Sequence, residues 1–145
     1  MGGPNPITLT LKNALLANNT YGAIPHENDF STAGGAASAV TVSGSNNLIR
    51  VATGSVPDGT LSGMCPLLKP LRDKGGGTRT HALSSTSPAI DRGNNDNFDP
   101  IIQATMVWDQ RGFSHARQSG TNTDIGAFEV DQNDMVFDSG FDGCP

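Results

Sequence analysis

An arginine and several carboxylates in the second half of the chain have the residue types best suited to chemistry. Arg111 carries a planar guanidinium whose fixed fork of donors matches a carboxylate. Four carboxylates could pair with it: Asp91, Asp109, Asp124 and Glu129. In one interpretation Arg111 clamps the carboxylate of a ligand or substrate. We favour the other, in which Arg111 forms an internal ion pair with at least one of these four residues.

Trp108 is the only tryptophan of the chain and directly precedes Asp109. Its ring could stack on a sugar, and it would then join Arg111, Asp91, Asp109 and Asp124 in a site for a carbohydrate or another ligand. The alternative is that the indole packs against its own turn, which is the more common role of an aromatic residue in this position.

The histidines do not form a catalytic constellation with any neighbour in the sequence. His26 and His115 lie in polar segments, where we expect them to be exposed. His81 lies in a Thr-His-Ala-Leu block, where an internal hydrogen bond is more plausible than a role as general base. No nucleophile elbow, zinc-protease motif or phosphate-binding loop occurs. We therefore assign no catalytic residue and favour a protein that is not an enzyme.

The aspartates of the second half could in principle hold calcium, which prefers oxygen ligands. The candidates are Asp91, Asp96, Asp99, Asp109 and Asp124. Their spacing matches neither an EF-hand loop nor a Gly-Asp nonapeptide repeat. We expect solvated carboxylates in turns and no cofactor, with calcium as the alternative.

Two cysteines, Cys65 and Cys144, lie far apart in the sequence and match no metal-binding pattern. One interpretation is a disulfide that pins the C-terminal tail to the rest of the chain. The other is two unpaired thiols. The sequence leaves both open.

The composition predicts an all-β protein with many turns. The chain has 145 residues, of which 18 are Gly and 9 are Pro, and only 16% are charged. A net charge of -5 without a basic stripe argues against a nucleic-acid partner. No apolar run approaches the roughly 20 residues that span a bilayer, so we expect no membrane insertion. Residues 1–6 lack the features of a signal peptide, so either export information lies upstream or the protein is cytosolic.

The first half contains two similar units, each a short strand, a polar bend and a second short strand. The first unit comprises Ile7–Leu11 and Ala14–Ala17, and the second comprises Ala39–Val42 and Leu48–Ile49. Asn and Ser residues form the bends, and no hairpin signal separates the strands. These features favour a solenoid in which successive turns stack. We expect residues 21–39 and 50–63 to be loops.

Four sequence blocks in the second half resemble the C-terminal region of the choice-of-anchor Q proteins, which are exported bacterial proteins with a pectin-lyase-like parallel β-helix. The blocks occur in the same order as in that family. They are Pro66–Leu83 with its Gly-Gly-Gly-Thr-Arg-Thr-His-Ala-Leu ending, Ser87–Gly93 (Ser-Pro-Ala-Ile-Asp-Arg-Gly), Asp109–Gly112 (Asp-Gln-Arg-Gly) and Asp124–Glu129 (Asp-Ile-Gly-Ala-Phe-Glu). Lys74 and Gly77 depart from the usual Asn and Pro.

This resemblance implies a short right-handed parallel β-helix with a C-terminal cap. Residues 1–130 would form the helix fragment, with the cap from about residue 78 to 129, and residues 131–145 would form a tail. It also implies a secreted or cell-surface location. We expect a structural or surface-interaction module without enzymatic activity, the C-terminal part of an exported protein. The alternative is a β-helix that binds polysaccharide or acts as a polysaccharide lyase or hydrolase.

The first coil of such a fragment, residues 7–16, would lack a neighbouring coil and expose Leu9, Leu11 and Leu15. Bare strand edges are templates for pairing with another chain. We therefore expect a homodimer formed through this exposed solenoid end. A polysaccharide or a cell-surface component is the other partner class that the resemblance implies.

Overall fold

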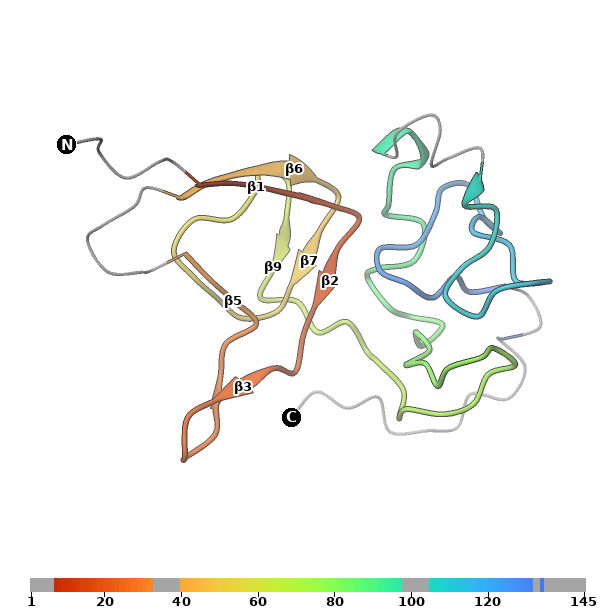
Figure 1. The fold of residues 1–145 in the computed structure, drawn as a ribbon, viewed down its shortest axis with the longest axis horizontal. Coiled ribbons are helices and arrows are strands. Elements are labelled where there is room, and N and C mark those ends of the chain that lie inside the picture. The colour runs from red at the N-terminus through yellow and green to blue at the C-terminus, as the bar shows by residue number, and fades with distance from the viewer. Residues whose placement is uncertain (1–6, 33–39, 98–104, 132–133, 135–145) are drawn as a thin grey trace.

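The computed structural model describes residues 7–32, 40–97, 105–131 and 134. Short strands occupy one part of the molecule, and the chain from about residue 66 onward forms an adjoining part built of loops (Figure 1). The elements in chain order are β1 (Ile7–Lys12), β2 (Leu15–Leu16), β3 (Thr20–Tyr21), β4 (His26–Glu27), β5 (Phe30–Ser31), β6 (Val40–Ser45), β7 (Leu48–Ile49), β8 (Ala52–Thr53), β9 (Leu61–Ser62) and a 3-10 turn, η1 (Asn95–Asn97).

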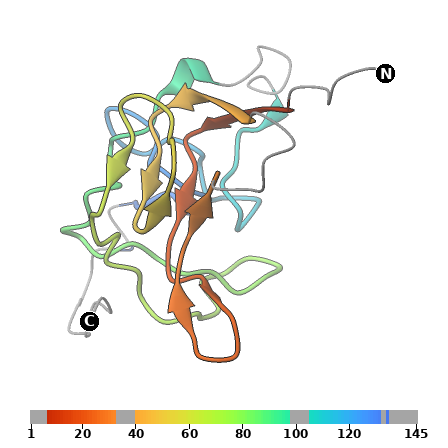
Figure 2. The same ribbon diagram turned by 90° about the vertical axis from the view of Figure 1, so that its left-hand side faces the viewer.

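The prediction of a parallel β-helix from the sequence is wrong. The described strands form four separate sheets, β1-β6, β2-β7-β9, β3-β4 and β5-β8, and they do not close into a solenoid. The β3-β4 pair is an antiparallel hairpin that projects from the strand part (Figure 2). Paired residues are 33 positions apart at Ile7 and Val40, but only 13 apart at Leu48 and Leu61. The described strands therefore do not recur at a constant spacing, as the coils of a β-helix would. Most of them are two residues long.

The strands of the two sequence units are nevertheless found where the alternation of residues predicts them. β1 and β6 pair in parallel with Ile7 opposite Val40 and Leu9 opposite Val42. Because side chains alternate along a strand, these residues share one face and the threonines and serines share the other. The hydroxyls of Thr10 and Ser43 lie 3.0 Å apart on that polar face. The segments expected to be loops contain the additional strands β3, β4, β5, β8 and β9.

Asparagines form the corners between these strands. Asn13 and Asn46 follow the paired residues Lys12 and Ser45, and both have a positive φ, of 52° and 55°. Asparagine enters this left-handed region more readily than most other residues. The fully buried Asn47 then accepts a hydrogen bond from the Ala14 N–H at 2.9 Å and donates to the Leu11 C=O at 3.0 Å. One side chain thus satisfies two backbone groups that the corner leaves unpaired.

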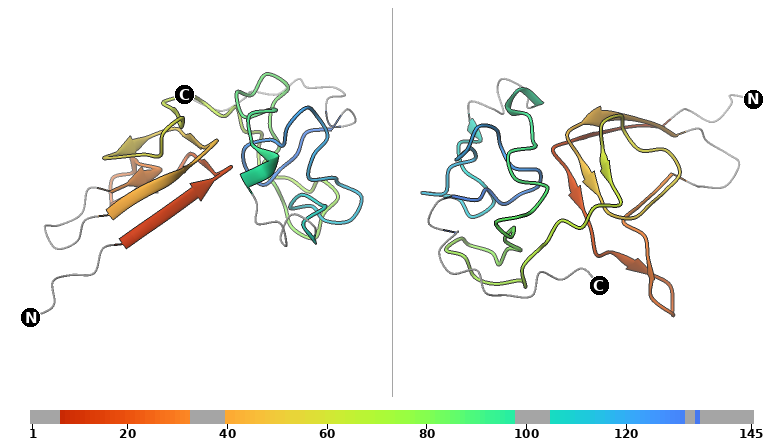
Figure 3. Two further views of the ribbon diagram at one scale, coloured as in Figure 1. Left: turned by 90° about the horizontal axis from the view of Figure 1, so that it is seen from above. Right: turned by 180° about the vertical axis from the view of Figure 1, so that it is seen from behind.

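The same corners join the strand part to the loop part. The Asn13 side chain donates to the C=O of Asn94 and accepts from its N–H, both at 2.9 Å. Asn46 donates to the Arg92 C=O at 3.0 Å. The Gly126 N–H donates to the Asn13 C=O at 2.9 Å. Figure 3 shows the two parts meeting along the ends of β1 and β6.

One apolar core spans this junction. Leu48 of β7 packs with residues of the loop part, and the partly buried Leu15 and Leu61 pack against them. The buried members from the loop part are Ala82, Leu83, Ala89, Ile125, Phe128 and Val130. The sequence blocks predicted to cover the strands thus supply most of the core.

Residues 78–83 of the loop part form no named strand. Isolated antiparallel bridges instead join Leu68 to Leu83 and Arg72 to Thr80. Cys65 is bonded in a disulfide, and the sequence contains one other cysteine, Cys144, which lies outside the described residues. The predicted tail, residues 131–145, also lies outside them except for Asp131 and Asp134. Among the residues described, none of the helices has the length and apolarity to cross a membrane.

We predict that Asn47→Ala destabilises the protein clearly. The substitution leaves the Ala14 N–H and the Leu11 C=O without their partner, and a buried unsatisfied group costs about 1–3 kcal/mol. Asn28→Ala is the control, because its Oδ1 has no hydrogen-bond partner and its amide makes only a 3.4 Å contact with Thr53. Chemical denaturation should show a lower midpoint for Asn47→Ala alone. Equal midpoints for the two variants would contradict the proposed role of the corner.

Candidate functional site

Arg111 lies at the centre of a buried network of charges. Its side chain is 1% exposed, and its Nη2 lies 2.7 Å from Oδ2 of Asp109, whose side chain is 0% exposed. Its Nη1 lies 2.9 Å from Oδ2 of Asp134, and its Nη2 donates to the Glu129 C=O at 2.6 Å. The prediction that Arg111 pairs with at least one nearby carboxylate is confirmed by the contact with Asp109.

The Asp-Gln-Arg-Gly sequence places this pair through its own turn. Oδ1 of Asp109 accepts a hydrogen bond from the Arg111 N–H at 2.7 Å, and the Gly112 N–H donates to the Asp109 C=O at 3.0 Å. An aspartate that caps a following N–H in this way stabilises a turn. Gly76 packs directly on the turn, since a Cβ there would lie 2.6 Å from the Arg111 Cα. A glycine is therefore needed at position 76 for the close approach of two loops.

The guanidinium of Arg111 also stacks on an aromatic ring. Its central carbon lies 3.9 Å from the centroid of the Phe128 ring, within the range of a cation–π interaction. Burial acts to lower the pKa of Arg111, but hydrogen bonds and charge from Asp109 and Asp134 outweigh it and raise the pKa above its usual value. Arg111 is therefore a fixed cation that organises the loops around it.

A second ion pair lies beside the first. Nη1 of Arg117 lies 3.1 Å from Oε2 of Glu129, whose side chain is 1% exposed. Glu129 also accepts hydrogen bonds from the N–H groups of Ser119 and Asp124, both at 2.9 Å. Arg117 further donates to the Gly126 C=O at 3.1 Å. The carboxylate thus holds together segments of the loop part that are up to twelve residues apart in the sequence.

Burial raises the pKa values of two carboxyls in this network. Removal from water raises the pKa of Glu129 from 4.5 to about 7, although its backbone hydrogen bonds and Arg117 favour the charged form. The pKa of Asp124 is also raised, mainly by burial, despite hydrogen bonds from the N–H groups of Val130 and Asp91. The charge of Asp124 also raises the pKa of Glu129, and the charge of Asp91 raises the pKa of Asp124.

The residues predicted from the sequence as a ligand site separate into two places. Arg111 and Asp109 form the buried pair, and Asp124 lies in the adjoining network. Asp91 joins through its backbone, because its N–H donates to Oδ1 of Asp124 at 2.8 Å and its own Oδ1 accepts from the Asn122 N–H at 3.0 Å. Trp108 belongs to the other place and is 38% exposed.

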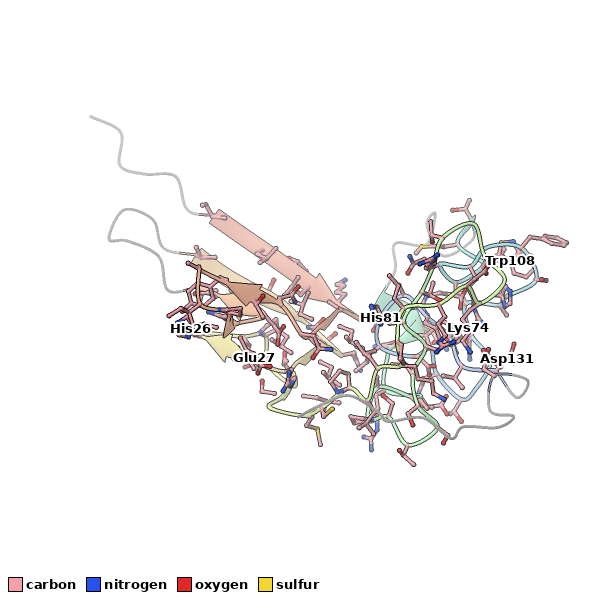
Figure 4. The ribbon with its side chains drawn as sticks, turned by 90° about the horizontal axis from the view of Figure 1, so that it is seen from below. His26, Glu27, Lys74, His81, Trp108 and Asp131 are labelled. Atoms are coloured by element: carbon pink, nitrogen blue, oxygen red, sulfur yellow. The ribbon has the colours of Figure 1, made fainter. Side chains whose placement is uncertain are left out.

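Trp108 lies in the loop part, remote from His26 and Glu27 of the hairpin (Figure 4). Its ring contacts that of Phe113 at a centroid distance of 5.4 Å, and Phe113 is 83% exposed. Trp108 also borders a groove of about 530 Å³ between the two parts of the molecule. Other residues of that groove include Lys12, Leu15, Met106, Gln110 and Arg117.

Two members of the charge network were missed in the sequence. Arg117 and Asp134 lie outside the four blocks that directed attention to Arg111. Arg117 has no acidic residue within six positions in the sequence, so its local sequence does not indicate the pair with Glu129. Asp134 lies in the segment assigned to a tail, and nothing in its local sequence indicates a buried partner.

The histidines and acidic residues show no sign of a catalytic or metal centre in the part of the chain that is described. Nδ1 of His81 lies 2.7 Å from the Lys69 C=O, as an internal hydrogen bond requires. His26 is exposed, whereas His115 is half-buried, contrary to expectation. Among the described residues no three His, Cys, Asp or Glu side chains are grouped as metal ligands. The calcium candidate Asp99 lies outside those residues.

Comparison with known proteins gives no relative for this chain. No protein-family model, no curated protein and no solved structure matches it.

We predict that Arg111→Met strongly destabilises the protein. The substitution leaves Asp109 buried without its cation, and breaking a buried pair from one side costs about 3–5 kcal/mol. Arg92→Met, at an exposed arginine, is the matched control. The double variant Arg111→Met/Asp109→Asn should recover part of the loss, because it removes the stranded charge. Urea denaturation measures all three, and an unchanged midpoint for Arg111→Met would show that the ion pair is not needed for stability.

We predict that the protein is less stable at about pH 8 than at about pH 5. The pKa of Glu129 in the folded state, about 7, lies above its ordinary value of 4.5. Its stabilising contribution is therefore fully present below pH 4.5 and is lost as the pH rises through about 7. Asp124 acts with the same sign. Melting temperatures across this pH range measure the effect.

Glu129→Gln should flatten this pH dependence whatever its effect on absolute stability. Glu27→Gln is the control, since Glu27 also pairs with an arginine but its side chain is 45% exposed. A pH profile that is identical in wild type and Glu129→Gln would contradict the raised pKa.

Proposed function

We propose that this chain is a structural or surface-interaction module without enzymatic activity, the C-terminal part of an exported protein. The resemblance of residues 66–129 to exported bacterial proteins is one support. The observation that carries the proposal is how the charged side chains of those residues are used. They bind the protein's own backbone and one another, and they leave little capacity for a substrate.

The hydrogen bonds of two carboxylates illustrate how these charged side chains are used. Both oxygens of Asp124 accept backbone N–H groups, from Asp91 and Val130, at 2.8 Å each. Both oxygens of Asp109 are likewise engaged, by the Arg111 and Glu129 N–H groups. A general acid or base must come within hydrogen-bond reach of the substrate atom that it serves. Carboxylates enclosed in this way support loop geometry better than proton transfer to a ligand.

The disulfide at Cys65 supports the exported location. Disulfides persist in oxidising compartments and are rare in the reducing cytosol. Short strands and a small core also leave this chain dependent on covalent and ionic ties, as in many small secreted domains. Both features support a location outside the cytosol, at the cell surface or in the medium.

A second candidate function is polysaccharide binding, and the exposure of Trp108 favours it. An exposed indole beside Phe113 offers an apolar surface on which a sugar ring can stack. The adjoining groove of about 530 Å³ adds Lys12 and Gln110 as polar contacts. In this alternative the module binds a glycan through the groove without cleaving it.

One experiment tests both candidates. Because Trp108 is the only tryptophan, its fluorescence reports on the groove directly when neutral and uronate polysaccharides are titrated into the protein. The same mixtures are then assayed for new reducing ends or unsaturated products. We predict no product with any polysaccharide, since no free acid–base pair faces the groove among the residues described. A saturable change in fluorescence without product would establish the second candidate.

Turnover that Asp91→Asn abolishes would overturn the non-enzymatic proposal. Asp58→Asn, at an exposed aspartate of the strand part, is the control for a general loss of charge. For the binding arm, Trp108→Phe retains an aromatic ring, and Trp108→Ala removes it. A glycan site that depends on stacking should weaken more in the alanine variant, which a competition assay with a labelled glycan measures.

A further inference from the structure

We propose that β1 pairs antiparallel with β1 of a second copy of this chain, in a register centred on Leu9. This inference rests on the proposed function, because it names the partner of one of the module's surfaces. The partner strand would extend the β1-β6 pair into a four-stranded sheet across a two-fold axis. Four observations on β1 lead to this arrangement.

The first observation is that β1 has a free edge. The β1-β6 sheet has two strands, so each is bonded along one edge only, and at six residues these two are the longest of the described strands. In Figure 3 (left), β1, in red, has β6 along one side only. Ile7 is 54% exposed and Leu9 is 37% exposed, so the described part of the chain does not cover this edge. An open edge of this kind can accept another strand.

The second observation is the direction of the backbone groups. The Asn13 N–H donates to the Ser45 C=O at 3.2 Å across the parallel pair. Because backbone groups alternate in direction along a strand, Leu11, Leu9 and Ile7 also turn theirs toward β6. Thr8 and Thr10 therefore turn their N–H and C=O groups toward the free edge. These two residues are the ones that can bond to a new strand.

The third observation is the self-matching sequence of the strand. Ile-Thr-Leu-Thr-Leu, residues 7–11, has the same order of residue classes in both directions from Leu9. Antiparallel pairing about Leu9 sets Thr8 opposite Thr10 of the partner subunit, and each such pair exchanges both of its backbone hydrogen bonds. Leu9 then faces Leu9 of the partner subunit in a non-hydrogen-bonded pair, where side chains approach most closely. The required bonding pattern and the observed direction of the backbone groups agree.

The fourth observation is that β1 lacks the features that usually prevent such pairing. Edge strands of monomers carry lysine, proline or a bulge that disfavours a second strand. Residues 7–11 contain no charge and no proline, and Lys12 lies at the end of the strand. The threonine face would also continue across the axis, because Thr10 and Ser43 already align their hydroxyls at 3.0 Å. A second copy pairs with this edge better than an arbitrary peptide does, because residues 7–11 are complementary to themselves in an antiparallel pair.

Sedimentation velocity tests the association. The wild-type chain should sediment as a dimer, and Leu9→Lys should sediment as a monomer, because two lysines would face each other across the axis. Leu9 is partly exposed, so this variant should keep the melting temperature of the dissociated wild type. Thr41→Lys, at an exposed position of β6, which lies away from the proposed two-fold axis, is the control and should remain dimeric.

Cysteine crosslinking tests the register separately from stability. Under mild oxidation Leu9→Cys should form a disulfide-linked dimer, because a non-hydrogen-bonded pair brings the two Cα atoms within disulfide range. Ile7→Cys alone should not, since it faces Leu11 of the partner subunit. The double variant Ile7→Cys/Leu11→Cys should crosslink again. Wild type is the control for exchange with the disulfide of Cys65.

A wild-type chain that stays monomeric at every accessible concentration would overturn the inference. Crosslinking of Ile7→Cys as strong as that of Leu9→Cys would overturn the register. Either result leaves the polysaccharide assays unaffected, because the Trp108 groove includes no residue of the segment from Ile7 to Leu11. If the proposed function is wrong, the protein will instead cleave a polysaccharide, whether it is a monomer or a dimer.

Discussion

The loop part of this protein depends on one buried cation. Arg111 has almost no exposed surface, and it binds two aspartates, a backbone carbonyl and the face of Phe128. Loops without regular ladders must satisfy their backbone groups in some other way. Here carboxylates accept the N–H groups, and arginines neutralise the carboxylates. A guanidinium with five donors in one plane can join several loops at once, which a lysine could not do with the same geometry.

Much of this arrangement was predictable from local sequence. Alternation located β1, β6 and β7, and the Asp-Gln-Arg-Gly block identified the Arg111–Asp109 pair. Such features depend on residues close together in the sequence. The local sequence did not predict the overall architecture. A parallel β-helix requires coils of constant length. The segments between paired strands shorten along the chain, and the sequence contains no local mark of that shortening.

The parts of the site that were missed have the same explanation. Asp134 reaches Arg111 across 23 positions, and Arg117 reaches Glu129 across 12, so neither pair leaves a short motif. Trp108 is partly exposed, whereas the Asp109 side chain that follows it is buried in the charge network. Residues that are adjacent in sequence, such as Trp108 and Asp109, can therefore have unrelated roles, one facing solvent and the other buried.

The contacts of Asn13 affect the order in which parts of the chain fold. Its side chain is bonded to Asn94, 81 positions later, and its C=O accepts from Gly126. Contacts this distant require a large loss of chain entropy before they form, and they slow folding. During synthesis the N-terminal strands must therefore wait until the second half has emerged. Throughout that interval the edge of β1, where residues 7–11 carry no charge, remains open, and this is when a chaperone would have the most to protect.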